Sequence, residues 1–214
     1  MTSQTQHKTR RPSVRRVQSS LSKRKQQVTR EAITDAAADV IRELGIDFSV
    51  QDVADRAGVT HRTVYRHFED REALVDAIGE RFEQWLAEEG LTQPQTLDDL
   101  PQHIEALFRL FDQFPDLVRA SALLTLTRGH PLARSKQRTD RFRRIFQSSL
   151  PVLPREEAEP AFAVLRGLTG SIGWYLLSSQ FGLSGARSGP AVGRALEAMI
   201  ADLRKRDEEA AVGG

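Results

Sequence analysis

The chain has 214 residues, 39% of them hydrophobic, which is enough for one compact body or two small domains with a core of ordinary size. Residues 1–30 hold nine Lys or Arg and no acid, whereas the remaining residues hold 22 basic and 29 acidic side chains, so the formal charge of +2 conceals a basic front end. The absence of cysteine excludes disulfides and thiolate metal sites. This asymmetry predicts a polyanionic partner for the front end alone, and the alternative is a merely solvated tail.

No stretch of the sequence predicts a membrane segment. The N-terminus is basic and polar, without the apolar region of a signal peptide. The most apolar stretch, residues 161–177, is interrupted by Arg166 and is too short and too polar to span a bilayer. We therefore expect a soluble, cytoplasmic protein that makes no membrane contact.

The front half of the chain predicts a polar arm followed by four helices. Residues 1–20 are almost free of apolar side chains and are expected to form a disordered basic arm. A helical stripe then runs from Ile33 to Leu44. Ser49 and Asp52 predict a capping box at the start of a second helix, and Thr60 caps a third. Residues 21–70 form this predicted domain, and a fourth helix over 71–89 connects it to the rest.

The back half predicts five more helices and no strands. Apolar residues at helical spacing, separated by Gly and Pro, place these helices within about 97–115, 116–128, 132–150, 155–181 and 190–206. Residues 207–214 are expected to fray. The sequence thus predicts an all-α fold of about nine helices, with a small three-helix front domain and a larger helical bundle over 97–206.

Residues 49–68, SVQDVADRAGVTHRTVYRHF, carry the strongest functional signal. Two short helices joined by a tight turn at Gly58 make a helix-turn-helix, which sets its second helix into the major groove of DNA. That second helix has cationic and hydroxyl side chains and no carboxylate before Glu69. This composition suits a polyanionic partner and argues against a helical adaptor that uses the domain for protein contacts.

The motif G-V-T-x-R-T-V-Y-R-H-F, followed by E-D-R-E-A-L, resembles the DNA-binding domain of the TetR/AcrR family of transcriptional regulators over about residues 25–86. The resemblance implies that Arg62 reads a base edge, as arginine does in bidentate pairing with guanine. It implies base or phosphate contacts for the other DNA-binding candidates, which are Ser49, Thr60, His61, Thr63, Tyr65, His67 and Arg71. Two alternatives are that Tyr65 packs into the core and that His67 is a surface residue that caps the helix end and does not contact DNA.

The family resemblance also implies dimerisation and ligand binding by the C-terminal half. The eighth predicted helix is apolar or small nearly all round, which favours burial on two sides, and with the ninth it predicts a two-fold homodimer interface. The alternative is a central core helix within a monomer. Aromatic residues with sparse polar groups suit a cavity for an apolar or amphipathic small molecule, or equally a filled core. The predicted lining is Phe108, Phe111, Ser121, Thr125, Phe142, Phe146, Thr169 and Trp174.

Enzymatic function has no support in the sequence. Its five histidines show no metal-binding spacing, and no nucleophile elbow, phosphate loop or dinucleotide fingerprint is present, so we predict no catalytic residue, metal or cofactor. The run of basic residues Arg134, Lys136, Arg138, Arg141, Arg143 and Arg144 is expected on the solvent side of its helix. The sequence therefore predicts a homodimeric repressor, released from an inverted-repeat operator in double-stranded DNA by a small ligand. The alternative is a sequence-indifferent nucleic-acid binder that uses the basic arm, which a salt-dependence measurement distinguishes.

Overall fold

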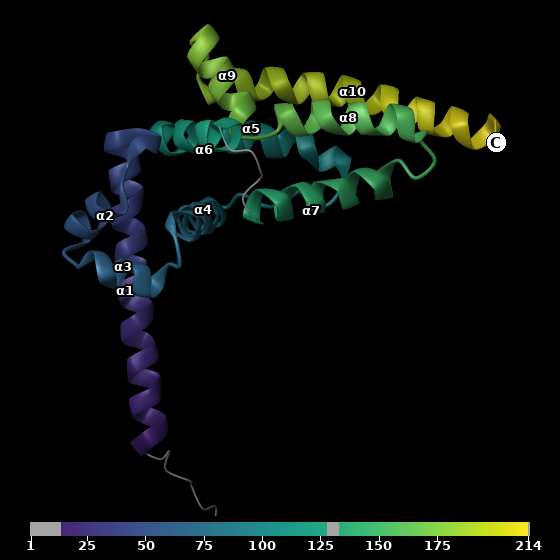
Figure 1. Cartoon of the computed structure of the whole chain (residues 1–214). Helices are drawn as coiled ribbons and strands as arrows, with labels where there is room; N and C mark the ends of the chain where they lie inside the picture. The colour runs from purple at the N-terminus through teal and green to yellow at the C-terminus, as the bar shows by residue number, and fades with distance from the viewer. Residues whose placement is uncertain (1–13, 128–132, 214) are drawn as a thin grey trace, which may run out of the picture.

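The computed structural model describes residues 14–127 and 133–213, with side chains over 21–127 and 136–212. Within these ranges the chain forms ten α-helices, two short 3-10 helices and no strand, which confirms the predicted all-α fold (Figure 1). The N-terminal elements are α1 (Val14–Leu44), η1 (Gly45–Asp47), α2 (Val50–Ala57), α3 (His61–His67) and α4 (Arg71–Glu88). The C-terminal elements are η2 (Leu97–Asp99), α5 (Leu100–Phe111), α6 (Pro115–Thr127), α7 (Ala133–Ser149), α8 (Arg155–Leu168), α9 (Ser171–Phe181) and α10 (Gly185–Gly213).

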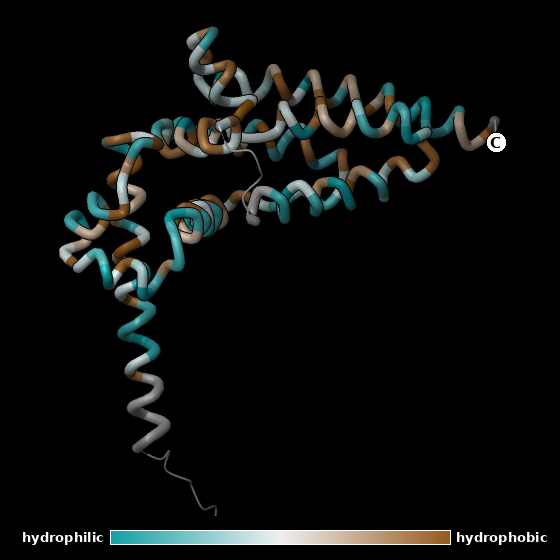
Figure 2. The backbone as a smooth tube through the Cα atoms, in the orientation of Figure 1, coloured by the Kyte–Doolittle hydropathy of each residue, from teal (hydrophilic) through white to brown (hydrophobic). Residues whose placement is uncertain are grey.

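The two halves of the chain build two apolar cores. In Figure 1 the upper part of α1 lies beside α2 and α3, and α5 to α10 extend to one side. The N-terminal core is formed by residues of α1 to α4, and the C-terminal core by residues of α4 to α10. Figure 2 shows a hydrophilic stretch of α1 below α3 that extends away from the other helices. Helix α6 contributes to each core, because Val118 packs in the C-terminal core while Ala120 and Leu124 pack in the N-terminal one.

The predicted helix caps of the N-terminal domain are present. Ser49 and Asp52 form the capping box of α2, Thr60 caps α3, and Asp70 caps α4 by accepting a hydrogen bond from the N–H of Ala73 at 2.7 Å. Gly58 ends α2 with a φ of +64°, a left-handed conformation that glycine adopts without strain. These local signals fix where α2, α3 and α4 begin, and so set the angle between the two helices of the helix-turn-helix.

Helix α1 begins at Val14, so the prediction of a disordered arm through residue 20 is wrong for residues 14–20. No Gly or Pro interrupts the sequence between Val14 and Leu44, so nothing stops the helix from continuing to its N-terminal end. The side chains of Gln27 and Glu31, one turn apart, add a 2.8 Å hydrogen bond on the exposed part of the helix. The rest of the predicted arm, residues 1–13, lies outside the described residues.

The predicted eighth helix is two helices in the structure. The chain leaves α8 at Thr169, passes through Gly170 in an extended conformation (φ −152°, ψ −168°), and begins α9 at Ser171. A Cβ on Gly173 would lie 2.6 Å from the backbone oxygen of Leu168, so this turn requires glycine there. Thr, Gly and Ser are weak helix formers, and together they allow the break.

Helix α10 is longer than predicted at both ends. Its first turn starts at Gly185 because Asp112, at the end of α5, accepts hydrogen bonds from the N–H groups of Gly185 at 2.6 Å and Ala186 at 3.0 Å. At the other end, Asp207 accepts a hydrogen bond from the N–H of Val152 at 2.8 Å. The expected fraying from residue 207 is therefore wrong, since the helix continues to Gly213. Both stabilising contacts come from residues distant in sequence.

We predict that Gly185→Ala destabilises the protein. A Cβ at this position would lie 1.8 Å from the backbone oxygen of Phe108, so α10 would have to move away from α5. Such overpacking is expected to lower the free energy of unfolding by about 1–3 kcal/mol. The measurement is chemical denaturation at a fixed protein concentration. The control is Gly167→Ala in α8, where a Cβ meets nothing within 4 Å and where alanine is the better helix former, so equal stability of the two variants would contradict the packing argument.

Candidate DNA-binding surface and ligand cavity

Helix α3 presents one basic, exposed face. His61, Arg62, Tyr65 and Arg66 are all exposed, whereas Val64 points inward and is 1% exposed. Tyr65 is 45% exposed, which rules out the alternative that it belongs to the core. The rings of His61 and Tyr65 pack edge to face at 4.8 Å between centroids. Arg66 was not among the predicted contacts, although its position four residues after Arg62 puts it on the same side of the helix.

Two arginines fix this domain from within. Arg30 of α1 lies over the ring of Phe68 at 4.2 Å and donates a hydrogen bond to the backbone oxygen of His67 at 2.6 Å, which attaches the end of α3 to α1. Arg71 lies over the ring of Phe48 at 4.2 Å and donates to the backbone oxygen of Ile46 at 2.5 Å. The guanidinium predicted to bind phosphate is thus engaged with the loop after α1.

The other predicted DNA contacts differ in how available they are. The hydroxyl of Ser49 donates to Asp52 within the capping box, at 2.6 Å. The hydroxyls of Thr60 and Thr63 bond each other at 2.9 Å. His67 is half-buried, and burial together with the charges of Arg66 and Arg30 lowers the pKa of its ring below the usual value, so it is uncharged at neutral pH. The side chains of α3 that remain available for DNA are therefore those of His61, Arg62, Tyr65 and Arg66.

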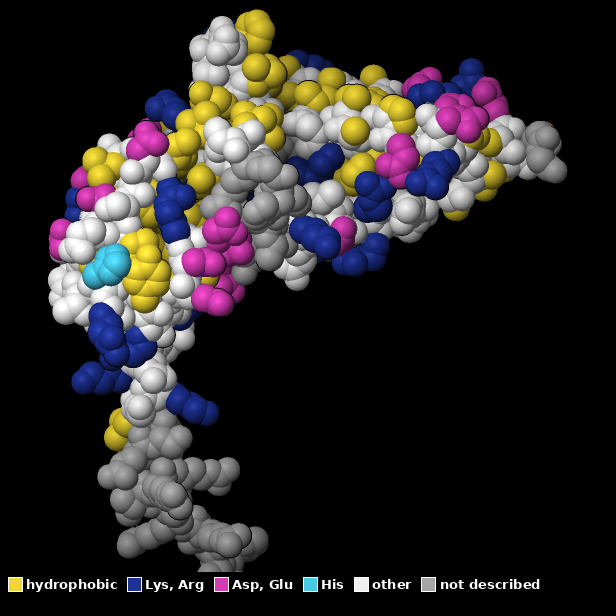
Figure 3. All heavy atoms as spheres, viewed as in Figure 1, with side chains coloured by type: hydrophobic (Ala, Val, Ile, Leu, Met, Phe, Trp, Pro, Cys, Tyr) yellow, Lys and Arg dark blue, Asp and Glu magenta, His cyan; other side chains and the backbone are white. Residues whose placement is uncertain are grey.

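The long helix α1 adds positive charge beside α3. Lys23, Arg24 and Lys25 are exposed on it, and Figure 3 shows Lys and Arg side chains gathered on its lower half. Positive charge spread over this end of the molecule favours the approach of a polyanion.

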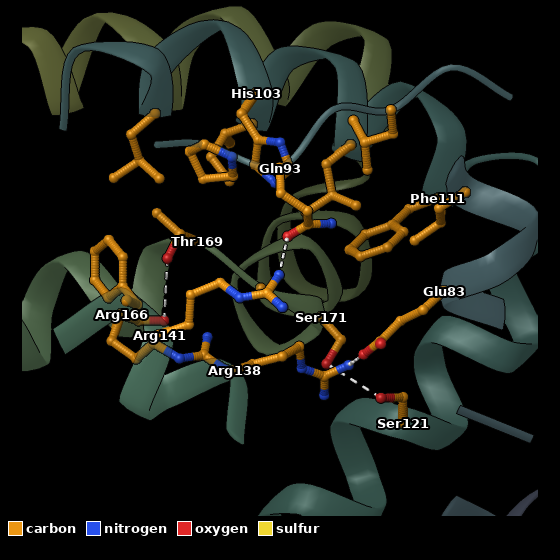
Figure 4. A pocket seen from close by; sticks show the side chains of 18 of the residues that line it. Glu83, Gln93, His103, Phe111, Ser121, Arg138, Arg141, Arg166, Thr169 and Ser171 are labelled. Atoms are coloured by element: carbon orange, nitrogen blue, oxygen red, sulfur yellow. Dashed lines mark hydrogen bonds and ion pairs between the residues drawn. The ribbon is translucent and has the colours of Figure 1, made fainter. Parts of the chain in front are cut away.

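A cavity of about 400 Å³ lies in the C-terminal half, between α4, α5, α6, α7 and the α8–α9 turn (Figure 4). Its apolar lining includes Leu86, Leu100, Ile104, Leu107, Val118 and Ile145, with Phe82, Phe111 and Phe142. Its polar lining includes Glu83, Gln93, His103, Ser121, Arg138, Arg141, Arg166, Thr169 and Ser171. The volume falls within the ~300–1,000 Å³ typical of small-molecule sites.

Four of the eight predicted ligand-binding residues line this cavity: Phe111, Ser121, Phe142 and Thr169. The other four do not. Phe108 is fully buried in the core, Phe146 packs against the ring of Phe162 at 5.7 Å, and Thr125 is exposed elsewhere on α6. Trp174 is 3% exposed and donates its ring N–H to Asp112 at 3.0 Å. Helical periodicity identified inward-facing residues but did not distinguish the residues of the core from those of a cavity wall.

The expected distribution of basic residues on α7 is wrong in part. Arg138 and Arg141 line the cavity, although the sequence predicted the whole run on the solvent side. Arg138 pairs with Glu83 of α4 at 2.7 Å, and Arg141 donates to the side-chain oxygen of Gln93 at 3.3 Å. The reason is the position of α7 alongside α4, which turns this side of the helix toward polar partners that periodicity could not reveal. Arg134 lies outside the residues whose side chains are described.

Surface apolar residues gather on α8 and α9. Val164, Leu176 and Phe181 are 51%, 52% and 67% exposed, and Figure 3 shows hydrophobic side chains over the upper side of the C-terminal half. By contrast, Val192, Leu196 and Leu203 of α10 are buried in the C-terminal core of the same chain. The α10 stripe assigned to a dimer interface therefore packs inside the monomer instead. No helix in the described ranges is both long and apolar enough to cross a membrane.

Comparisons with known proteins agree with this fold and with the helix-turn-helix. Residues 33–78 match the family model described as bacterial regulatory proteins of the TetR family, and no curated protein matches the sequence. The structure is similar to that of the transcriptional regulator FadR from Bacillus subtilis, solved in complex with stearoyl-CoA, with 20% identity over 78% of this chain and 96% of that one and a TM-score of 0.56.

A Mesorhizobium loti protein assigned to the TetR family is also similar, with 18% identity over 83% of this chain and 96% of that one and a TM-score of 0.50. The matched segment, residues 33–78, contains α2, α3, the exposed face of α3 and the start of α4. Residues 33–78 therefore match a TetR-family DNA-binding domain, and the fold of the chain is similar to that of solved transcriptional regulators.

Proposed function

We propose that this protein is a homodimeric repressor that binds an inverted-repeat operator and is released from it by a small ligand in the C-terminal cavity. The main support for this proposal is that α4 and α6, which line the cavity, also pack in the core of the DNA-binding domain. Phe82 and Leu86 of α4 line the cavity, while Leu74 and Ile78 of the same helix pack in the N-terminal core. A ligand that displaces α4 therefore moves the domain that carries α3.

Helix α6 provides a second connection of the same kind. Val118 and Ser121 line the cavity, and Ala120 and Leu124 pack in the N-terminal core. The half-sites of an inverted repeat lie a fixed distance apart, so a small change in the separation of two α3 helices weakens binding to both. Repression relieved by ligand follows from this geometry more directly than activation does.

The interface we propose for the dimer lies on α8 and α9, with the outer side of α10. Exposed Val164, Leu176 and Phe181 would be covered there, and Ala191, Ala195 and Ala198 of α10 are small enough for close approach of a second helix. A protein acting on operator DNA works where the DNA is, which for bacterial regulators is the cytoplasm.

The test of the proposed function is selection of bound sequences from random duplex DNA, followed by a screen for small molecules that abolish the complex. We expect an inverted repeat, bound at least about 10³-fold more tightly than random DNA, and a steep dependence of the affinity on salt. Equal affinity for the selected and the random duplex would instead support a sequence-indifferent binder.

Arg62 is expected to read a base. Arg62→Ala should cost about 1–3 kcal/mol on the selected operator and relax the preference at one base position in each half-site. Tyr65→Phe, in contrast, should lower affinity for all sequences alike, because it removes only a hydroxyl suited to phosphate. Both variants are measured by fluorescence anisotropy on specific and random duplexes. An equal loss on both duplexes for Arg62→Ala would show that it contacts only the backbone.

Val164→Asp should weaken the dimer. A carboxylate at the proposed interface would be buried without a partner, and we expect the dissociation constant of the dimer to rise by at least about tenfold. Sedimentation equilibrium measures the effect. Val212→Asp is the matched control, because Val212 lies on the last turns of α10 and is 91% exposed. The same dimer affinity in both variants, or a stable monomer of the unchanged protein at micromolar concentration, would contradict the assignment.

A further inference from the structure

The cavity is apolar at its inner end and basic at its open side. Leu100, Ile104 and Val118 in its wall are 3%, 1% and 1% exposed, so they lie deep in the fold. Arg138 and Arg141 also line the cavity but are exposed residues of α7. Figure 4 shows Arg138, Arg141 and Arg166 next to one another on one side, with His103 and Phe111 across from them. A ligand complementary to this cavity has an apolar end at the inner wall and a polar end next to the arginines.

The charges at that side do not balance. Of the residues that line the cavity, three are arginines and one, Glu83, is a carboxylate. Glu83 is already paired with Arg138 at 2.7 Å. His103 adds no compensating charge of either sign, because burial lowers the pKa of its ring below the usual value and leaves it neutral at neutral pH. The cavity thus carries an excess of positive charge that an anion would neutralise.

Arg166 is the least compensated of the three. Its Nε donates to the hydroxyl of Thr139 at 3.2 Å, and within the described residues no carboxylate pairs with it. Burial and the charge of Arg138 lower the pKa of its guanidinium, which means that its charge is unfavourable where it stands. A half-buried guanidinium retained beside an apolar cavity needs a negative partner, and guanidinium binds carboxylate or phosphate through paired hydrogen bonds.

We propose that the cavity binds an anionic amphiphile, whose acid group pairs with Arg166 and Arg141 and whose apolar chain lies among Ile104, Val118 and Phe142. This inference rests on the ligand-responsive function proposed above and narrows its ligand to one chemical class. It adds a negative charge to the apolar or amphipathic ligand expected from the sequence, because Arg138 and Arg141, which were expected on the solvent side of α7, line the cavity. Carboxylate and phosphate share the required chemistry.

The test uses the full-length protein without DNA and four ten-carbon probes: decanoate, decyl phosphate, decanol and decylammonium. Isothermal titration calorimetry gives the affinity of each below its solubility limit. We expect decanoate or decyl phosphate to bind at least tenfold more tightly than decanol, and decylammonium more weakly than decanol. The stronger of the two anions identifies the acid group. Equal affinity for anion and alcohol, tighter binding of the ammonium, or no binding of any probe would overturn the proposal.

Three variants locate the acid group. Arg166→Gln and Arg141→Gln should each reduce the preference for the anion over decanol to less than threefold, while affinity for decanol stays within twofold. Arg144→Gln is the matched control, because Arg144 is an exposed arginine of α7 that does not line the cavity, and its preference should be unchanged. Thermal unfolding verifies that each variant folds. If one arginine variant fails to fold, the other variant still tests the proposed site. If a folded Arg166→Gln or Arg141→Gln variant keeps the full preference for the anion, that arginine does not bind the acid group.

A failure of the anionic-ligand proposal can be distinguished from a failure of the proposed regulatory function. A protein that binds none of the four probes but is released from its operator by another compound refutes the anionic ligand and keeps the regulatory role. A protein that prefers decanoate but keeps its full operator affinity when saturated with it supports the binding site and contradicts release by this ligand.

Discussion

The structure depends on one constraint, which is that α6 has to pack in two cores at once. Val118 belongs to the C-terminal core and Ala120 and Leu124 to the N-terminal one, so the two domains cannot move independently unless α6 moves as well. Interiors are closely packed and respond to displacement by switching between discrete arrangements rather than by yielding gradually. A cavity beside such a helix is therefore in a position to control the domain on its other side.

The polar contacts around the cavity are too weak to hold the two domains in one arrangement. Arg138 and Glu83 join α7 to α4, but their side chains are 46% and 29% exposed, and solvent-accessible ion pairs contribute about 0–1 kcal/mol. The hydroxyls of Ser121 and Ser171 lie 3.5 Å apart, at the limit of a hydrogen bond. A coupling free energy of about 1–3 kcal/mol between ligand and DNA has to come mainly from elsewhere.

Much of the fold was predictable because its signals are local. Caps at Ser49, Thr60 and Asp70 and the stripe of α1 depend on residues within a few positions of one another, and the structure contains each of them. Two of the missed features depend on distant partners, because Asp112 accepts hydrogen bonds from the first residues of α10 and Asp207 bonds Val152 near its other end. The turn at Gly170 between α8 and α9 is local, but periodicity alone did not distinguish it from a continuous helix. For the cavity, too, the local signals were visible in the sequence and the long-range contacts were not. Arg166 was visible as a lone charge in an apolar stretch, but only the fold shows that it meets Arg138 and Arg141.

Aromatic packing is the stronger connection between the cavity and the DNA-binding domain. Phe82 of α4 stacks on Phe111 of α5 at 6.0 Å, and both rings line the cavity. Phe82 also contacts Trp85 at 5.8 Å and Phe114 at 6.2 Å, just before α6 begins. Each aromatic pair contributes about 0.5–1.5 kcal/mol beyond the area it buries. A ligand that displaces Phe82 therefore disturbs contacts to both α4 and the start of α6, the two helices shared with the N-terminal core, and these contacts together are large enough to supply the coupling that the ion pair cannot.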